Sequence, residues 1–149
     1  PGASSPYTRL PTPLPPSCRH DAPARNAPAE IYGPDYESPD GTCIREYSYI
    51  RDLPRDNILA LGAKESAYYN LGTGGGSSVR EVIDICREVS GREIPVVEKP
   101  RRPGDPPRLI AASEKIKREL GWAPKFENLR AIIESAWRRT QKFQDGFGD

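Results

Sequence analysis

Apolar residues recur at the three- and four-residue spacing of an α-helix through most of the chain after residue 50. This pattern predicts helices over about residues 52–62, 78–91, 113–121 and 127–143. Asp52 and Ser113 are expected N-caps, and Ser78 with Glu81 has the spacing of a capping box. In chain order, the faces expected to be buried are Leu53, Ile58, Leu59 and Leu61; Val79, Val82, Ile83, Cys86 and Val89; Ile116 and Leu120; and Leu129, Ile132, Ile133, Ala136 and Trp137.

Shorter runs of apolar, aromatic and β-branched residues alternate with these helices. They predict strands at Ala29–Tyr32, Ile44–Ile50, Ala67–Leu71 and Ile94–Val97. Residues that favour turns, mostly glycine and proline, separate the strands from the elements that follow. The alternation of strands with helices is typical of an α/β protein.

The first 29 residues differ in amino-acid composition from the rest of the chain. They hold eight of the seventeen prolines and few apolar residues beyond Tyr7, Leu10 and Leu14. Such a segment buries too little surface to offset its ordering entropy. We therefore expect residues 1–29 to be a disordered or polyproline-like tail and residues 30–149 to be the folded domain. A ligand of an SH3-type domain at residues 13–16 is the alternative that the composition leaves open.

Composition and charge exclude several function classes. The formal net charge is +1 and the pI is near 8.2, so no electrostatic footprint for nucleic acid or an anionic membrane is present. No apolar run approaches the roughly 18 residues of a membrane span or forms a signal-peptide core. Three scattered cysteines and one histidine argue against a disulfide framework, a zinc site or a Ser-His-Asp triad. A cytoplasmic protein without nucleic-acid or membrane partners is expected.

A glycine-rich turn at residues 72–76 follows a predicted strand and precedes a predicted helix. This context suggests a dinucleotide-binding loop, with Glu98 as the acidic residue that would bind a ribose. The third glycine of that motif is replaced by Ser77, however. The alternative is a tight turn that needs glycine only for its backbone conformation. Taken alone, the two readings have similar weight.

Four blocks of sequence, in order and with fitting gaps, resemble UDP-glucose 4-epimerases over residues 30 to about 143. The first, residues 40–53, is similar to the family's Asp-Gly-Thr-x-x-Arg-Asp-Tyr-x-His-Val-x-Asp-Leu. The others are Tyr69-Asn70-Leu71-Gly72-Thr73-Gly74, Pro100-Arg101-Arg102-Pro103-Gly104-Asp105 and Glu119-Leu120-Gly121-Trp122. In this family the glycine turn near residue 72 is structural, because the cofactor loop lies far upstream.

The resemblance implies an α/β fold, the C-terminal substrate-binding portion of an extended Rossmann-type sugar-nucleotide epimerase, with the N-terminal Rossmann half absent. Family members bind NAD in that half, interconvert UDP-galactose and UDP-glucose in galactose metabolism, and are often homodimers. The resemblance implies that Arg45 and Arg102 bind the diphosphate, for which a planar, permanently charged guanidinium is suited. It implies that Asp105 accepts a bond from a ribose hydroxyl. It also implies that Glu30, Ile31 and Tyr32 form the strand that lies along the uracil. Tyr47 corresponds to a family tyrosine near the diphosphate. Without the resemblance, the two arginines would be taken for exposed ion pairs.

The sequence departs from the family pattern at three positions: Glu46 replaces an aspartate, Tyr49 replaces a histidine and Pro54 replaces an alanine. These departures concern local packing. Another departure concerns chemistry. The family reaction uses a tyrosine with a lysine four residues later, and no tyrosine of this sequence has one. We therefore expect the chain to supply UDP-sugar binding, with no catalytic residue and no epimerase activity of its own. A stand-alone nucleotide-sugar-binding module is the alternative function.

Overall fold

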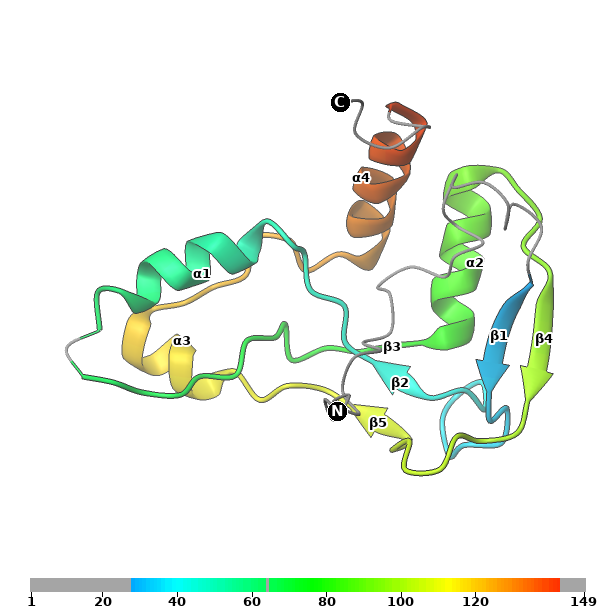
Figure 1. Cartoon of the computed structure of the whole chain (residues 1–149), viewed down its shortest axis with the longest axis horizontal. Helices are drawn as coiled ribbons and strands as arrows, with labels where there is room; N and C mark the ends of the chain where they lie inside the picture. The colour runs from blue at the N-terminus through cyan, green and yellow to red at the C-terminus, as the bar shows by residue number, and fades with distance from the viewer. Residues whose placement is uncertain (1–27, 64, 143–149) are drawn as a thin grey trace, which may run out of the picture.

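The computed structural model of the chain describes residues 28–63 and 65–142 (Figure 1). Nine elements follow one another there: β1 (Ala29–Tyr32), β2 (Ile44–Arg45), α1 (Asp52–Ala60), β3 (Ser77–Ser78), α2 (Val79–Ser90), β4 (Val96–Lys99), β5 (Arg108–Leu109), α3 (Glu114–Leu120) and α4 (Leu129–Lys142). This α/β arrangement agrees with the expected class. The predicted tail lies almost wholly outside the described residues, and β1 begins at Ala29, where a strand was predicted.

The strands form two small sheets. β1 and β4 pair in parallel, and the register places Tyr32 opposite Lys99. β2 lies between β3, which runs antiparallel to it, and β5, which runs parallel. Figure 1 shows the first sheet beside α2 at one end of the molecule, the second sheet in the middle, and α1 with α3 at the other end.

The hydrophobic core lies between the β1–β4 sheet, α2 and α4. Its buried members are Ala29, Ile31, Val82, Ile83, Cys86, Ile94 and Ile133. Since every second residue of a strand faces the same side, Ile31 points into this core while Glu30 and Tyr32 face the other way. The predicted apolar face of α2 is confirmed, and an ion pair between Arg130 and Glu88 joins α4 to α2.

The Asp-Gly-Thr sequence at residues 40–42 supports the N-terminus of α2. The capping box is confirmed, because the Ser78 hydroxyl accepts from the Glu81 amide and the Glu81 carboxylate accepts from the Ser78 amide. The Asp40 carboxylate accepts from the Ser78 hydroxyl and from both the amide and hydroxyl of Thr42. Gly41 has a φ of +80°, and a Cβ there would overlap the carbonyl oxygen of Pro34. This motif therefore organises the turn that supports α2.

Three predicted strands differ from the observed ones. The strand predicted at 44–50 is limited to Ile44–Arg45, because β3 and β5 pair with those two residues only. The strand predicted at 94–97 is displaced to Val96–Lys99 by its register with β1. The segment predicted at 67–71 is not a strand in the described structure. A strand exists only where a neighbouring strand supplies its hydrogen bonds, and sequence patterns do not report that neighbour.

Two predicted helix caps are also wrong. Asp52 is the first residue of α1, and its carboxylate accepts hydrogen bonds from the amides of Lys125 and Phe126 across the chain. Ser113 precedes α3, but its side chain makes no capping bond. The helix expected from residue 127 begins at Leu129, where the Asn128 side chain accepts from the amide of Ala131. Gly91 and Gly121 follow their helices in the left-handed conformation, at the ends of the predicted ranges 78–91 and 113–121.

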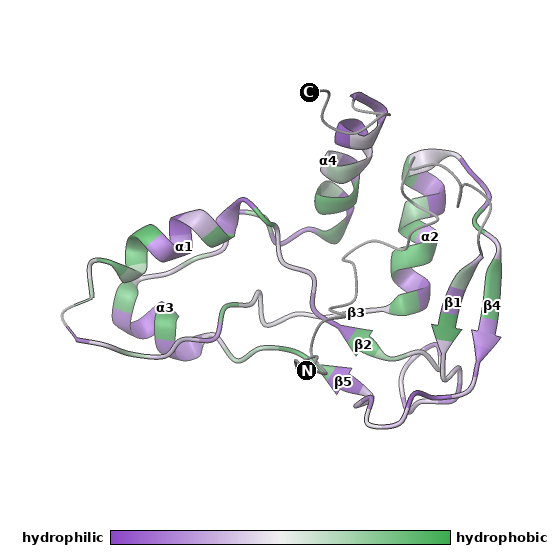
Figure 2. Ribbon diagram, viewed as in Figure 1, coloured by the Kyte–Doolittle hydropathy of each residue, from purple (hydrophilic) through white to green (hydrophobic). Residues whose placement is uncertain are grey.

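The predicted buried side of α1 is wrong as well. Its buried residues are Asp52 and Asp56, whereas Leu53, Ile58 and Leu61 are 42%, 70% and 85% exposed. Asp56 accepts a 2.6 Å hydrogen bond from the indole N–H of Trp122. Figure 2 shows apolar colour on α1, which lies at the periphery away from β1, β4 and α2. Polar contacts thus decide which side of this helix faces the protein.

Candidate functional site

The segment between β4 and β5, residues 100–107, brings two of the predicted site residues together. Arg45 on β2 donates through Nη1 to the carbonyl oxygens of Ile44 and Pro106, each at 2.9 Å. Its Nη2 lies 3.6 Å from the carboxylate of Asp105, and its side chain is 19% exposed. Arg45 is therefore held in position with its charge partly desolvated, which strengthens its attraction for an anion.

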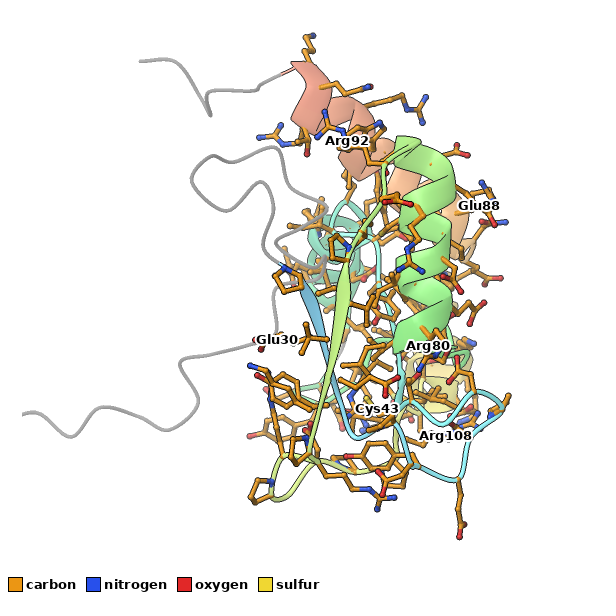
Figure 3. The ribbon with its side chains drawn as sticks, turned by 90° about the vertical axis from the view of Figure 1, so that its right-hand side faces the viewer. Glu30, Cys43, Arg80, Glu88, Arg92 and Arg108 are labelled. Carbon is orange, nitrogen blue, oxygen red and sulfur yellow. The ribbon has the colours of Figure 1, made fainter. Side chains whose placement is uncertain are left out.

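Arg102 lies on the same segment and stacks on the ring of Tyr32, with its guanidinium carbon 3.6 Å from the ring centroid. The hydroxyl of Tyr32 donates to Glu30 at 2.5 Å, and Glu30 forms an ion pair with Lys99. Hydrogen bonds from Lys99 and then Tyr32 lower the pKa of Glu30. Figure 3 shows Glu30 on the side of the β1–β4 sheet opposite α2. An aromatic ring and three charged groups thus share one exposed face.

The neighbouring Arg101 has a different function. Its Nε donates to the Asp35 carboxylate at 2.8 Å, and its guanidinium lies over the ring of Tyr36. These contacts secure the turn after β1. Of the two consecutive arginines, Arg101 is held by hydrogen bonds to Asp35, whereas the guanidinium of Arg102 lies over the ring of Tyr32 and interacts electrostatically with Glu30.

Two predicted residues lie away from this exposed face. Ile31 is 1% exposed and belongs to the core, so only its backbone is available to a ligand. Tyr47 packs against the core, and burial raises its pKa to about 12. Its hydroxyl is therefore protonated at neutral pH and suits hydrogen bonding rather than proton abstraction.

Two residues of this region were missed by the sequence analysis. Lys99 reaches Glu30, and the strand pattern contained the signal, because the parallel register places the ends of β1 and β4 side by side. Cys43 is buried next to Arg45, Asp105 and Arg102, and burial raises its pKa. Figure 3 shows Cys43 beneath the lower end of α2. No sequence signal marked this cysteine.

The family model described as GDP-mannose 4,6 dehydratase matches residues 32–135. The chain belongs to this family. It is 48% identical over 118 residues to a UDP-glucose 4-epimerase from Corynebacterium glutamicum, a match that covers 77% of this chain and 36% of the relative. The chain therefore spans about a third of the length of that relative.

Solved structures of epimerases share the fold. One crystal structure of a UDP-glucose 4-epimerase has a TM-score of 0.79 and 44% identity, covering 85% of this chain and 40% of that one. A second, from Bifidobacterium longum in complex with NAD+ and UDP, has a TM-score of 0.77 and 34% identity, covering 90% and 41% respectively. The resemblance to epimerases seen in the sequence is thus confirmed at the level of family and fold.

This member of the GDP-mannose 4,6 dehydratase family uses its glycine turn to hold a carboxylate of its own. Glu46 accepts 3.0 Å hydrogen bonds from the amide of Gly74 and the hydroxyl of Thr73, and its other oxygen accepts from the amide of Ala111 at 2.8 Å. A Cβ at Gly72 would overlap that carboxylate. A negative charge already fills the position where a dinucleotide phosphate would bind, so the turn is structural.

The N-terminus of α2 is also occupied. The amides of Val79, Arg80 and Glu81 donate to the Cys43 carbonyl, the Thr42 hydroxyl and the Ser78 hydroxyl. Glu98, the expected ribose ligand of a dinucleotide site, is paired with Arg80 at 2.8 Å. The residues at this turn therefore do not fit NAD.

Residues 28–63 and 65–142 contain no group of three or more histidine, cysteine, aspartate or glutamate side chains placed to hold a metal ion. In the same part of the chain, no helix is long and apolar enough to cross a bilayer.

Proposed function

We propose that this chain is the UDP-sugar-binding part of a UDP-glucose 4-epimerase and carries none of the residues that perform the hydride and proton transfers. The observation that supports it most is the convergence of Arg45, Asp105, Arg102 and Tyr32 through the single segment between β4 and β5. Two guanidinium groups, a carboxylate and an aromatic ring are the groups that a nucleoside diphosphate requires.

Each group of the ligand has a partner in this proposal. Arg45 and Arg102 neutralise the diphosphate, and Asp105 accepts from a ribose hydroxyl. Tyr32, Glu30 and the backbone of Ile31 line the base, and the protonated hydroxyl of Tyr47 donates toward the diphosphate side. NAD and the catalytic groups belong, in this proposal, to the portion of epimerases that this chain does not span.

Binding requires that Arg102 leave the ring of Tyr32. A cation–π contact at an exposed position contributes about 0.5–1 kcal/mol, whereas a hydrogen bond to a charged group contributes about 1.5–3 kcal/mol. Exchange of the ring for a phosphate is therefore favourable. It also frees one face of Tyr32 for the planar base.

Calorimetry with UDP on a monomeric, folded preparation tests the assignment. Arg45→Ala and Arg102→Ala are each expected to weaken binding about tenfold or more, and lysine at either position to restore only part, because paired geometry is lost. Arg138→Ala on α4 is the matched control and leaves affinity unchanged. Since Arg45 also contacts two backbone carbonyls, thermal melting must show that the variant is folded. Equal affinity of wild type and the double alanine variant refutes the site.

The absence of catalysis has a separate test. Purified chain supplied with NAD and UDP-galactose is expected to form no UDP-glucose in a coupled assay. The physical reason is that Tyr47, whose pKa is raised to about 12, is a poor base and has Arg51 rather than lysine four residues later. Turnover that persists through purification and is lost on heating the chain overturns this part of the proposal.

A further inference from the structure

The strand that carries Arg45 is short, and its support beyond Arg45 comes from a side chain. β2 has only two residues and pairs with β3 on one side and with β5 on the other. Both ladders of hydrogen bonds end at Arg45. Figure 1 shows the chain running into β3 on one side of β2 and out of β5 on the other. Strands are usually longer, and a ladder of two residues gives its last member little support.

Glu46, the next residue, continues this pairing through its carboxylate. One oxygen accepts from the amide of Gly74 and the hydroxyl of Thr73, each at 3.0 Å, in the turn that leads into β3. The other oxygen accepts at 2.8 Å from the amide of Ala111, which follows β5. Hydrogen bonds to a charged acceptor are stronger than those between neutral groups. Glu46 therefore ties both flanking segments together at the point where the ladders stop.

This tie bears directly on the contacts of Arg45. The guanidinium of Arg45 donates to the carbonyl of Pro106 at 2.9 Å and lies 3.6 Å from the carboxylate of Asp105. Both partners belong to the segment that leads into β5, so these contacts last only while β2 and β5 stay side by side. Glu46 holds the two strands together just beyond Arg45, through Ala111. Its own bonds involve none of the groups assigned to the ligand.

We propose that Glu46 is a positioning residue of the diphosphate site. It keeps Arg45 aligned with the segment that carries Asp105 and Arg102, so that both guanidinium groups meet one diphosphate. This inference rests on the proposed function of the site. A side chain that only stabilised the fold would change the free energy of unfolding and leave the UDP affinity of the folded chain unchanged. A positioning residue changes that affinity, and does so through Arg45.

The substitution Glu46→Gln removes the tie without leaving a cavity. Glutamine has nearly the same shape as glutamate, but an NH₂ group, which is a donor, replaces one of the two oxygens. Whichever way the amide turns, this donor faces the amide N–H of either Gly74 or Ala111. One side of the tie is therefore lost, because two donors cannot bond to each other.

Calorimetry with UDP on the purified chain compares wild type, Glu46→Gln, Arg45→Ala and the double variant. Glu46→Gln is expected to weaken UDP binding about threefold to tenfold. In the Arg45→Ala background the same substitution should weaken it less than about twofold, because the arginine that Glu46 aligns is absent. The stoichiometry of the same titration gives the folded fraction, so a loss of folded chain is separated from a loss of affinity.

Two glycines of the turn provide a second test that keeps Glu46 in the sequence. A Cβ at Gly72 would overlap the Glu46 carboxylate, whereas a Cβ at Gly75 would come no closer than 3.8 Å to the hydroxyl of Thr73. Neither glycine has a positive φ, so alanine fits the backbone at both positions. Gly72→Ala should displace the carboxylate and weaken UDP binding about as much as Glu46→Gln. Gly75→Ala is the matched control and should leave the affinity unchanged. If Glu46→Gln does not fold, this pair decides.

The possible results separate the role of Glu46 from the proposed function. Wild-type affinity for UDP in folded Glu46→Gln and Gly72→Ala overturns the positioning role and leaves the site intact. Equal losses from Glu46→Gln with and without Arg45 also overturn it, because Glu46 would then act independently of the arginine. Unchanged affinity in Arg45→Ala, or no binding of UDP by the wild-type chain, refutes the proposed site itself.

Discussion

The two ends of the molecule follow opposite rules of burial. Around α2, apolar residues face inward and form the core with β1, β4 and α4. Around α1, Asp52 and Asp56 are buried, whereas Leu53, Ile58 and Leu61 are exposed. Hydrophobic burial is the main favourable term in folding, so the α2 region has its driving force within the chain. Leu53, Ile58 and Leu61 of the α1 region are 42%, 70% and 85% exposed, so they add little to that driving force within the part of the chain that the structure describes.

The contacts that hold the two regions also differ. Around α2, backbone groups are capped by nearby side chains in a continuous network from Asp40 to Glu81. The α1 region is held by a few long-range polar bonds, from Asp52 to the backbone near Lys125 and from Asp56 to Trp122. Burying a carboxylate is costly unless its bonds are well made, so such contacts specify a position more than they stabilise it.

The largest expected effect is the contrast between one isoleucine from each region. Ile83→Ala removes a side chain that is 1% exposed in the core and should lower the free energy of unfolding by about 2–5 kcal/mol. Ile58→Ala on α1 removes one that is 70% exposed and should change it by less than about 0.5 kcal/mol. Urea denaturation measures both. Similar losses of stability from the two substitutions would show that the α1 and α2 regions do not differ in the burial of their apolar side chains.

A second contrast uses two glycines with almost the same positive φ. Gly41→Ala combines a φ of +80° with overlap between the new Cβ and the backbone of Pro34, and should cost about 2–4 kcal/mol. Gly74 has a φ of +79°, and a Cβ there meets no atom within 4 Å, so Gly74→Ala should cost only about 1 kcal/mol. Thermal unfolding of both variants gives the difference. Equal costs would show that the packing around Gly41 adds nothing to its backbone strain.

Sequence reasoning succeeded where a local pattern and its partner lie in the same segment. The capping box of α2 needs only Ser78 and Glu81, and the apolar face of α2 is read from helical spacing, so both were predicted. It failed where the partner is distant. Asp52 has the sequence context of an N-cap, but its carboxylate accepts a hydrogen bond from the amide of Lys125. This contact depends on the fold, because the two residues are 73 positions apart in the sequence.

The same distinction applies to the candidate site. Arg45 and Arg102 were assigned through the family resemblance, and the structure places them on β2 and on the segment that joins β4 to β5. Lys99 was missed because its relevance depends on the parallel register with β1. The exposed face of α1 was expected to be buried, because spacing alone indicates which residues share a side and not which way that side points.

A smaller effect is expected when the polar network at the start of α2 is removed. Asp40→Ala takes away the acceptor for Ser78 and Thr42 and should cost about 1–2 kcal/mol at neutral pH. Burial raises the pKa of Asp40, but the bonds from Ser78 and Thr42 outweigh it and lower the pKa overall. The contribution is therefore present above the usual aspartate pKa and is lost as the pH falls through the folded value. Wild type and Asp40→Ala should converge in stability below about pH 4. A difference that persists at lower pH would mean that charge is not what Asp40 contributes.

The smallest effect at neutral pH is expected from Tyr47, which packs against the core of the α2 region. Burial raises the pKa of Tyr47 to about 12, above the ordinary tyrosine value of 10. Below about pH 10 the phenol is protonated in both the folded and unfolded chain, so its contribution to stability is complete. Between about pH 10 and pH 12 the unfolded chain loses the proton while the folded chain keeps it, and stability falls as the pH rises. Tyr47→Phe cannot lose a proton, so the stability difference between wild type and variant should be constant from about pH 7 to pH 9 and then shift in favour of the variant. Urea denaturation at a series of pH values measures this difference. Curves that remain parallel up to about pH 11.5 would show that Tyr47 is not buried with the core, and the α2 region would then be less self-contained than its packing indicates.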